Sequence, residues 1–312
     1  MDVTTGLWIW TVTGLLAIIA VDIWLAWRDP HEVGFREAAA WSTFYVGIAL
    51  AFGGWLFLRF GGEIGTEYLA AYLVEKSLSV DNLFVFAIIL AQFAVPRILQ
   101  QRVLLIGVVL ALVLRAIFIA VGAAALKAFT VTFVLFGAIL LWTGIGLLRH
   151  WREEPDAKDN SAVRLARRWF PVTDDYHGDA LTVRISGKRH LTPLLLVMVA
   201  VASTDLLFAL DSIPATFGVT TEPYLVFTAN AFALLGLRAL YFLLDGLLDR
   251  LIYLSLSLAA ILIFIGVKLM LVYAHEVVPS IPKIPTGLSL GVIAVILVAG
   301  VVASLRQEKR NG

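Results

Sequence analysis

The chain has 312 residues, of which 60% are hydrophobic and 15% charged, and its mean hydropathy is +0.91. A soluble domain has about 45–50% apolar and about 25% charged residues, so this composition excludes a soluble fold and predicts an integral membrane protein. The net charge of +1 gives no indication of a nucleic-acid partner, and the absence of cysteine excludes disulfides, thiolate catalysis and thiolate metal sites.

A transmembrane helix needs about 20 mostly apolar residues. Nine segments meet this requirement, which predicts an all-α polytopic membrane protein with nine transmembrane helices. In chain order they are 6–27, 38–60, 66–94, 102–125, 130–149, 191–217, 224–247, 251–274 and 286–305. The first is too long for the apolar core of a signal peptide and has no basic residue before it, so we expect it to remain as a helix.

These helices and one long polar stretch divide the chain into five parts. Residues 1–60 hold two helices, 61–149 hold three, and 150–190 form a polar loop. Residues 191–275 hold three more helices, and 276–312 hold the ninth helix and a tail. The loop is expected to be solvated, and its function is left open by the sequence.

The distribution of Lys and Arg predicts the orientation in the membrane. The connections on one side, together with the C-terminus, carry 17 of these residues, and the opposite side carries three. Because basic loops remain in the cytoplasm, the N-terminus is expected outside the cell, and the C-terminus and the 150–190 loop are expected on the cytoplasmic side.

Two helices share a polar pattern that indicates an internal repeat. At one offset of 130 residues, three polar positions coincide: Glu75 with Asp205, Asp81 with Asp211, and Asn82 with Ser212. Two further matches follow in order, at offsets of 123 and 122: Arg115 with Arg238, and Gly144 with Gly266. Each copy has three helices, an odd number, so helices 3–5 and 6–8 are predicted to form inverted repeats, as in secondary transporters.

Charged side chains inside the apolar segments are the candidate functional groups. A charge at the bilayer centre costs about 2.5–3.5 kcal/mol on the insertion scale, so these groups must be paired, hydrated or metal-bound. Structural ion pairing remains an alternative for all of them. For the repeated acids it is the less favoured reading, because ion pairing does not require the small oxygen-bearing neighbours Asn82 and Ser212.

Oxygen donors of both repeats are predicted to form one mid-membrane site for a hard divalent cation such as Mn²⁺, Mg²⁺ or Ca²⁺. The proposed ligands are Glu75, Asp81, Asn82, Asp205, Asp211 and Ser212. Six residues along a helix leave Glu75 and Asp81 on different faces, so a local break in each motif helix is expected. The proposed gating or charge-compensating residues are Lys76, Arg115, Arg238 and Asp245. Lys76 would neutralise the empty site, and the two arginines would lock the repeats together.

The two motifs, 75–85 and 205–215, resemble the signature of the TerC family, most closely its Alx-like manganese-exporter branch. The resemblance covers nearly the whole chain and leaves the 150–190 loop unassigned. It implies a plasma-membrane exporter of Mn²⁺ whose metal ligands are Glu75, Asp81, Asp205 and Asp211, with Asn82 beside them.

The expected function is therefore export of Mn²⁺ by alternating access, with proton coupling left open, no resident cofactor and no enzymatic activity. The partners expected are a divalent metal ion and the lipid bilayer. Two alternatives remain open: a calcium/proton exchanger, since carboxylates alone do not separate Mn²⁺ from Ca²⁺, and a membrane assembly factor that recruits proteins through the 150–190 loop.

Overall fold

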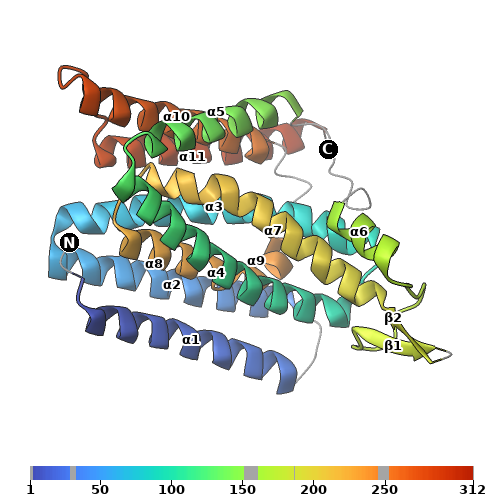
Figure 1. Ribbon diagram of the computed structural model, residues 1–312. Helices are drawn as coiled ribbons and strands as arrows, with labels where there is room; N and C mark the ends of the chain where they lie inside the picture. Colours follow the sequence, from blue (N-terminus) through green and yellow to red (C-terminus); the bar gives the residue numbers. More distant parts are fainter. Residues whose placement is uncertain (1–2, 29–32, 151–160, 186, 245–252, 312) are drawn as a thin grey trace.

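The computed structural model describes residues 3–28, 33–150, 161–185, 187–244 and 253–311. They form a bundle of long helices with a small β-hairpin at one end (Figure 1). The helices of the first half are α1 (Thr5–Arg28), α2 (Phe35–Phe60), α3 (Gly62–Gln92), α4 (Arg97–Ala128), α5 (Thr132–His150) and α6 (Ser161–Trp169). After strands β1 (Thr182–Ile185) and β2 (Lys188–Leu191) come α7 (Pro193–Phe217), α8 (Pro223–Leu234), α9 (Leu237–Leu244), α10 (Leu254–Val277) and α11 (Thr286–Asn311).

In Figure 1, α1 lies along one edge of the bundle and α5, α10 and α11 lie along the opposite edge, with the two motif helices α3 and α7 between them. The buried apolar side chains form a large cluster around α2, α3, α8 and α10, and a second one around α3, α4 and α7. The motif helices are therefore enclosed by protein on several sides, which suits helices that carry charges.

Seven helices of the described residues are long and apolar enough to cross a membrane, and the bent pair α8–α9 gives an eighth span if it is counted as one. α3 is not among the seven, because three of the last 18 residues of this helix are charged: Glu75, Lys76 and Asp81. Its 31 residues nevertheless extend about 46 Å, more than the hydrocarbon core of about 30 Å. The polytopic membrane fold is thus confirmed, and the count of nine crossings stays a prediction.

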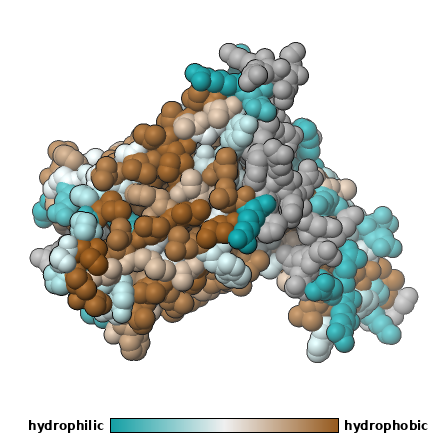
Figure 2. Space-filling model, turned by 90° about the horizontal axis from the view of Figure 1, so that it is seen from above, coloured by the Kyte–Doolittle hydropathy of each residue, from teal (hydrophilic) through white to brown (hydrophobic). Residues whose placement is uncertain are grey.

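The outer surface agrees with a membrane environment. Figure 2 shows one face of the molecule as a broad hydrophobic area, with hydrophilic side chains gathered toward the ends. Large apolar side chains are exposed along the bundle, including Trp142 on α5 and Val295 on α11, at 80% and 68% exposure. Exposed apolar area of this extent is unfavourable in water and favourable in lipid.

Two glycines with positive φ shape the chain where its helices turn or bend. Gly61, at φ +99°, is the single residue between α2 and α3. Gly236, at φ +75°, separates α8 from α9, whose axes differ by 41°. A side chain at Gly236 would also collide with Tyr45, since its Cβ would lie 2.6 Å from the ring. Glycine is the residue that adopts this conformation at little cost.

The described part of the predicted 150–190 loop is largely exposed, as expected, but it is folded and not an irregular loop. Residues of this segment form α6 and most of a two-stranded hairpin, so the fold is also not strictly all-α. Val163 of α6 is buried, and the Tyr176 hydroxyl donates to the Phe93 carbonyl at 2.8 Å. The hydrogen bond from Arg102 lowers the pKa of the Asp179 carboxyl. The segment therefore packs on the ends of α3, α4 and α7.

The contact between α5 and α10 has an internal symmetry. A Cβ at Gly266 would lie 3.0 Å from the Gly137 carbonyl oxygen, and a Cβ at Gly144 would lie 3.0 Å from that of Ala259. At the repeat offset of 122, Gly137 corresponds to Ala259 and Gly144 to Gly266, so a two-fold exchange of the helices converts one contact into the other. This reciprocity supports the inverted-repeat prediction, as does the packing of α3 on α8 and of α4 on α7.

We expect Gly144→Val to destabilise the protein by about 1–3 kcal/mol, because its Cβ would lie 2.8 Å from Ile263 as well as against the α10 backbone. Gly146→Val, two residues along the same helix, is the matched control, since a Cβ there meets nothing within 4 Å. Thermal unfolding midpoints of the two purified variants in one detergent provide the measurement. Equal midpoints would contradict close packing of α5 on α10.

Candidate functional site

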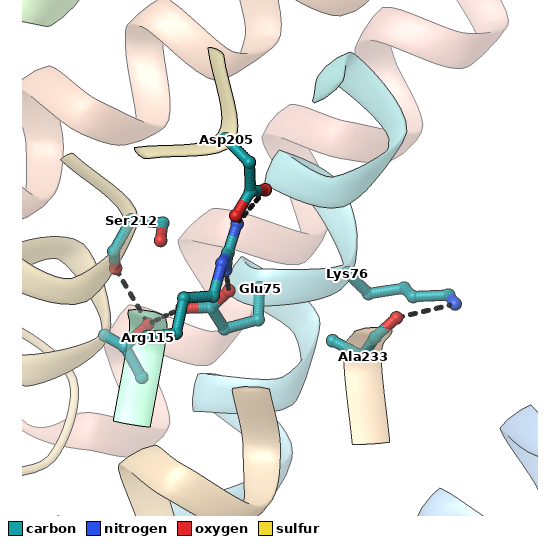
Figure 3. A network of polar contacts seen from close by, with 7 residues as sticks. Glu75, Lys76, Arg115, Asp205, Ser212 and Ala233 are labelled. Atoms are coloured by element: carbon teal, nitrogen blue, oxygen red, sulfur yellow. Dashed lines mark hydrogen bonds and ion pairs between the residues drawn. The ribbon is translucent and has the colours of Figure 1, made fainter. Parts of the chain in front are cut away.

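A buried arginine lies between the two repeated motifs. The guanidinium of Arg115, on α4, donates from Nη1 to Glu75 Oε2 at 2.8 Å and from Nη2 to Asp205 Oδ1 at 3.5 Å. Arg115 and Glu75 are 0% exposed, and Asp205 is 3% exposed. Figure 3 shows the guanidinium between the two carboxylates. Because Glu75 belongs to α3 and Asp205 to α7, one cation joins the first acid of each motif.

An amide and a hydroxyl extend this cluster. With its amide assigned by hydrogen bonding, Asn82 accepts from Arg115 Nη2 at 3.2 Å and donates to the Leu78 carbonyl at 3.0 Å. The Thr216 hydroxyl lies 2.6 Å from Glu75 Oε1 and 2.9 Å from the Ser212 carbonyl oxygen. Among the described residues, the partners of Arg115 are therefore oxygen atoms, from two carboxylates and an amide.

Several buried oxygens of the motifs lack a hydrogen-bond partner among the described residues. They are Asp205 Oδ2, Ser212 Oγ and Ser79 Oγ. A buried polar group without a partner costs about 1–3 kcal/mol, so each of these oxygens calls for an explanation. Acceptors left over beside a held cation suggest that the cluster is built to take a different ligand.

Two cavities lie at different levels along the bundle. The Asn82 cavity, of about 500 Å³, is lined by Asn82 and Asp211 together with side chains of α5 and α10 around Thr143 and Leu258. The Glu67 cavity, of about 170 Å³, is lined by Glu67, Thr220 and Lys268 among others. Along α3, α5, α7 and α10 alike, the two cavities occupy different halves of the helix. Glu75 and Thr216 lie between the two cavities on α3 and α7.

The structure brings together three of the six predicted ligand residues, namely Glu75, Asn82 and Asp205, but around a guanidinium. Asp211 lines the Asn82 cavity, and Ser212 is buried beside Thr216. The side chain of Asp81 lies outside the described residues. Among the described residues, no three acidic or histidine side chains are close enough to hold a metal ion together.

The expected break in each motif helix is wrong. α3 and α7 are each continuous, and α7 continues through Pro214 to Phe217. The oxygens converge because α3 and α7 face each other and Arg115 reaches both, so no unwinding is required. The break occurs instead between α8 and α9, in the seventh predicted helix.

The predicted compensating residues have different surroundings. Lys76 points away from Glu75, and its Nζ donates to the Ala233 carbonyl of α8 at 3.3 Å (Figure 3). Arg238 donates to Asp22 of α1 at 2.6 Å and to Gln101 of α4 at 3.2 Å. Asp245 lies outside the described residues. Arg115 thus neutralises the acids, as Lys76 was expected to do, and Arg238 attaches α9 to α1 and α4.

Thr216 is the residue of the cluster that the sequence reasoning missed. It follows Ser212 by four residues, one helical turn, so it extends the polar face of the second motif toward Glu75. The turn-by-turn spacing of Ser212, Thr216 and Thr220 was a signal that could have revealed it.

Comparisons with known proteins agree with this architecture. The profile described as "Integral membrane protein TerC family" matches residues 60–312. The chain is 50% identical over 274 residues to an uncharacterized membrane protein of Mycobacterium tuberculosis, covering 86% of this chain and 69% of that protein. It is 41% identical over 304 residues to an uncharacterized membrane protein of Myxococcus xanthus, covering 97% and 93%. It is 39% identical over 308 residues to Alx of Escherichia coli, named as a proposed membrane-bound redox modulator, covering 95% and 94%. No solved structure matches the chain.

We expect Arg115→Met to lower the stability by about 3–5 kcal/mol, because it leaves two carboxylates buried without their cation. The triple variant Arg115→Met, Glu75→Gln, Asp205→Asn removes the charges as well and should recover much of the loss. Unfolding midpoints in detergent measure both, with Arg59→Met at an exposed position of α2 as the control. A single variant as stable as the control would show that the cluster is not a buried ion pair.

Proposed function

Because this chain belongs to the TerC family of integral membrane proteins, we propose that it is a transporter that exports Mn²⁺ from the cytoplasm across the bacterial plasma membrane. The observation that carries the proposal is a cation, the Arg115 guanidinium, enclosed by oxygen donors of both repeats. We call the oxygen atoms of Glu75, Asn82 and Asp205 around this guanidinium the cage. Because the cage holds one cation at the meeting point of two repeats, it has the chemistry needed to bind another.

The charge of the cluster favours a divalent cargo. Glu75 and Asp205 together carry two negative charges, and Arg115 compensates one of them. A divalent ion in place of the guanidinium would neutralise both carboxylates, and the orphan oxygens Asp205 Oδ2 and Ser212 Oγ would become available as ligands. Uncompensated charge is costly in a low-dielectric interior. A divalent ion that neutralises both carboxylates can therefore compete with the Arg115 guanidinium for them.

The two cavities provide the two access paths of an alternating cycle. With the N-terminus outside, the Asn82 cavity opens toward the cytoplasmic half and the Glu67 cavity toward the outer half. The metal enters the Asn82 cavity, where Asp211 and Asn82 offer the first oxygens. It then displaces Arg115 from Glu75 and Asp205, and it leaves on the side of Glu67. Rocking of one repeat against the other would open each path in turn.

The identity of the metal rests on the family resemblance and on the ligand type. Carboxylate, amide and hydroxyl oxygens suit Mn²⁺, Mg²⁺ and Ca²⁺, whereas softer metals prefer sulfur or imidazole. A calcium/proton exchanger is therefore the second candidate. The name of the Escherichia coli relative refers to redox modulation. This chain has no cysteine, so its own residues cannot carry out redox chemistry through a thiol.

We expect Glu75→Gln and Asp205→Asn to abolish Mn²⁺ export, because each removes a carboxylate from the cage. Cellular Mn²⁺ would be measured by mass spectrometry in a manganese-sensitive strain carrying each variant at equal expression. Asp174→Asn, an exposed acid of the polar segment, makes the same type of change away from the cage and should export like the wild type. Full export by both cage variants would rule out this site.

Metal preference separates the two candidate cargoes. We expect Mn²⁺ to raise the unfolding midpoint of the purified protein at lower concentration than Ca²⁺ does, through preferential binding to the folded state. The shift should disappear in the Glu75→Gln variant. Stronger stabilisation by Ca²⁺ would favour the calcium exchanger, and no stabilisation by either ion would argue against a cation cargo.

A further inference from the structure

Helix α6 buries one side and leaves large apolar side chains exposed on the rest of its surface. Val163 is buried in the apolar cluster around α3, α4 and α7. Leu165, Trp169 and Phe170, by contrast, are 57%, 73% and 55% exposed. Apolar side chains that lie together and are exposed to this extent mark a surface that binds another molecule or the membrane.

Basic side chains lie beside the exposed apolar ones. Arg164 and Arg168 are one helical turn apart, as are Leu165 and Trp169. At about 100° per residue, the two pairs form adjacent rows on the side of α6 that faces away from Val163. Arg167 is exposed as well, and α6 contains no acidic residue. Within the described ranges, none of the three arginines forms an ion pair.

A backbone contact sets the level of α6 along the bundle. The Leu191 amide donates to the Pro171 carbonyl at 2.9 Å. α6 ends at Trp169, two residues before Pro171, and the apolar helix α7 begins at Pro193, two residues after Leu191. Figure 1 shows α6 beside this end of α7. Trp169 therefore lies near the level at which α7 enters the membrane, where tryptophan is enriched in membrane proteins.

A bilayer surface that contains anionic phospholipids complements both rows of α6. Lipid phosphates accept hydrogen bonds from guanidinium groups, and the region below the headgroups accommodates leucine and tryptophan side chains. Each basic residue near such a surface strengthens binding by roughly fivefold, so three arginines contribute on the order of 100-fold. A soluble acidic protein would match the arginines, but it would not explain why the apolar row lies at the level where a transmembrane helix begins.

We propose that the side of α6 formed by Arg164, Leu165, Arg168 and Trp169 binds anionic phospholipids of the leaflet in which α7 begins. Arg167 adds a third positive charge at its edge. Because α6 belongs to the connection between α5 and α7, the lipids hold the link between the two predicted repeats at the membrane surface. The proposal goes beyond the proposed export of Mn²⁺ and does not depend on it.

The absence of cysteine allows a single label to test this in the full chain. Leu165→Cys would carry a polarity-sensitive fluorophore, in nanodiscs of phosphatidylcholine or of an equal mixture with phosphatidylglycerol. We expect emission at shorter wavelength in the mixed bilayer, because anionic lipid draws the label out of water. The same fluorophore on Lys188→Cys, an exposed position at the turn of the hairpin, should emit alike in both bilayers. Equal emission from Leu165→Cys in the two bilayers, or an equal shift from Lys188→Cys, would overturn the proposal.

Charge variants in the Leu165→Cys background locate the binding surface. The neutral variant combines Arg164→Gln, Arg167→Gln and Arg168→Gln. We expect it to lose the shift, whereas the variant with Lys at the same three positions should retain it because the charge is kept. The matched control removes three exposed charges from the hairpin: Arg184→Gln, Lys188→Gln and Arg189→Gln.

The control should retain the shift, and all three variants should keep the unfolding midpoint of the parent in detergent, because the changed side chains are exposed. A shift that is lost in the hairpin control and kept in the neutral α6 variant would assign the lipid contact to the hairpin and reject α6. Emission that is insensitive to phosphatidylglycerol but changes when soluble polyglutamate is added would identify an acidic protein as the partner and reject the membrane surface.

Discussion

The buried contact of Arg115 with Glu75 and Asp205 is the interaction on which the rest of this molecule depends. Moving an unpaired ion of this kind into a medium of low dielectric costs on the order of 20 kcal/mol in the idealised limit. Two carboxylates can therefore remain charged inside the bundle only while a cation accompanies them. The planar guanidinium serves three acceptors at once, which a lysine ammonium on a flexible stem does less well. Three helices, α3, α4 and α7, are consequently fixed to one another at a single point.

The same contact explains why the two halves of the molecule are alike in sequence and unlike in structure. The motifs match at three polar positions, and the α5–α10 contact is reciprocal. Only one of the two matched arginines enters the cage, however, while Arg238 binds Asp22 of α1, a helix outside both repeats. Arg238 instead connects α9 with α1 and α4 and adds no second cation to the cage. The symmetric plan thus produces an asymmetric molecule.

Much of the fold could be predicted from the sequence, because lipid imposes a simple rule on helix length and composition. Hydropathy located α1, α2, α5, α7 and α10 to within three residues at each end. It also located the two helices that carry the repeated acids, because charged residues inside an apolar segment are visible in a single sequence. The arrangement of these helices was less accessible, because the partner of Glu75 lies 40 residues away on α4.

The errors have physical reasons of the same type. Lys76 follows Glu75 directly in the sequence, but neighbours on a helix point about 100° apart, so it contacts α8 instead. The bend between α8 and α9 leaves the hydropathy almost unchanged, because leucine and glycine form it. The polar composition of the 150–190 stretch does not indicate a packed segment. Burial of Val163 and the hydrogen bond of Tyr176 nevertheless attach it to the bundle.

The bend at Gly236 gives the two repeats different mechanical properties. In the first repeat the corresponding helix, α4, runs unbroken through 32 residues, whereas the second repeat has a joint at this level. A helix deforms most easily where its ladder of hydrogen bonds is already interrupted, and glycine adds torsional freedom there. The second repeat can therefore bend at this level more easily than the first. Arg238, two residues beyond the bend, binds Asp22 and so connects the bent segment with α1, a helix outside both repeats.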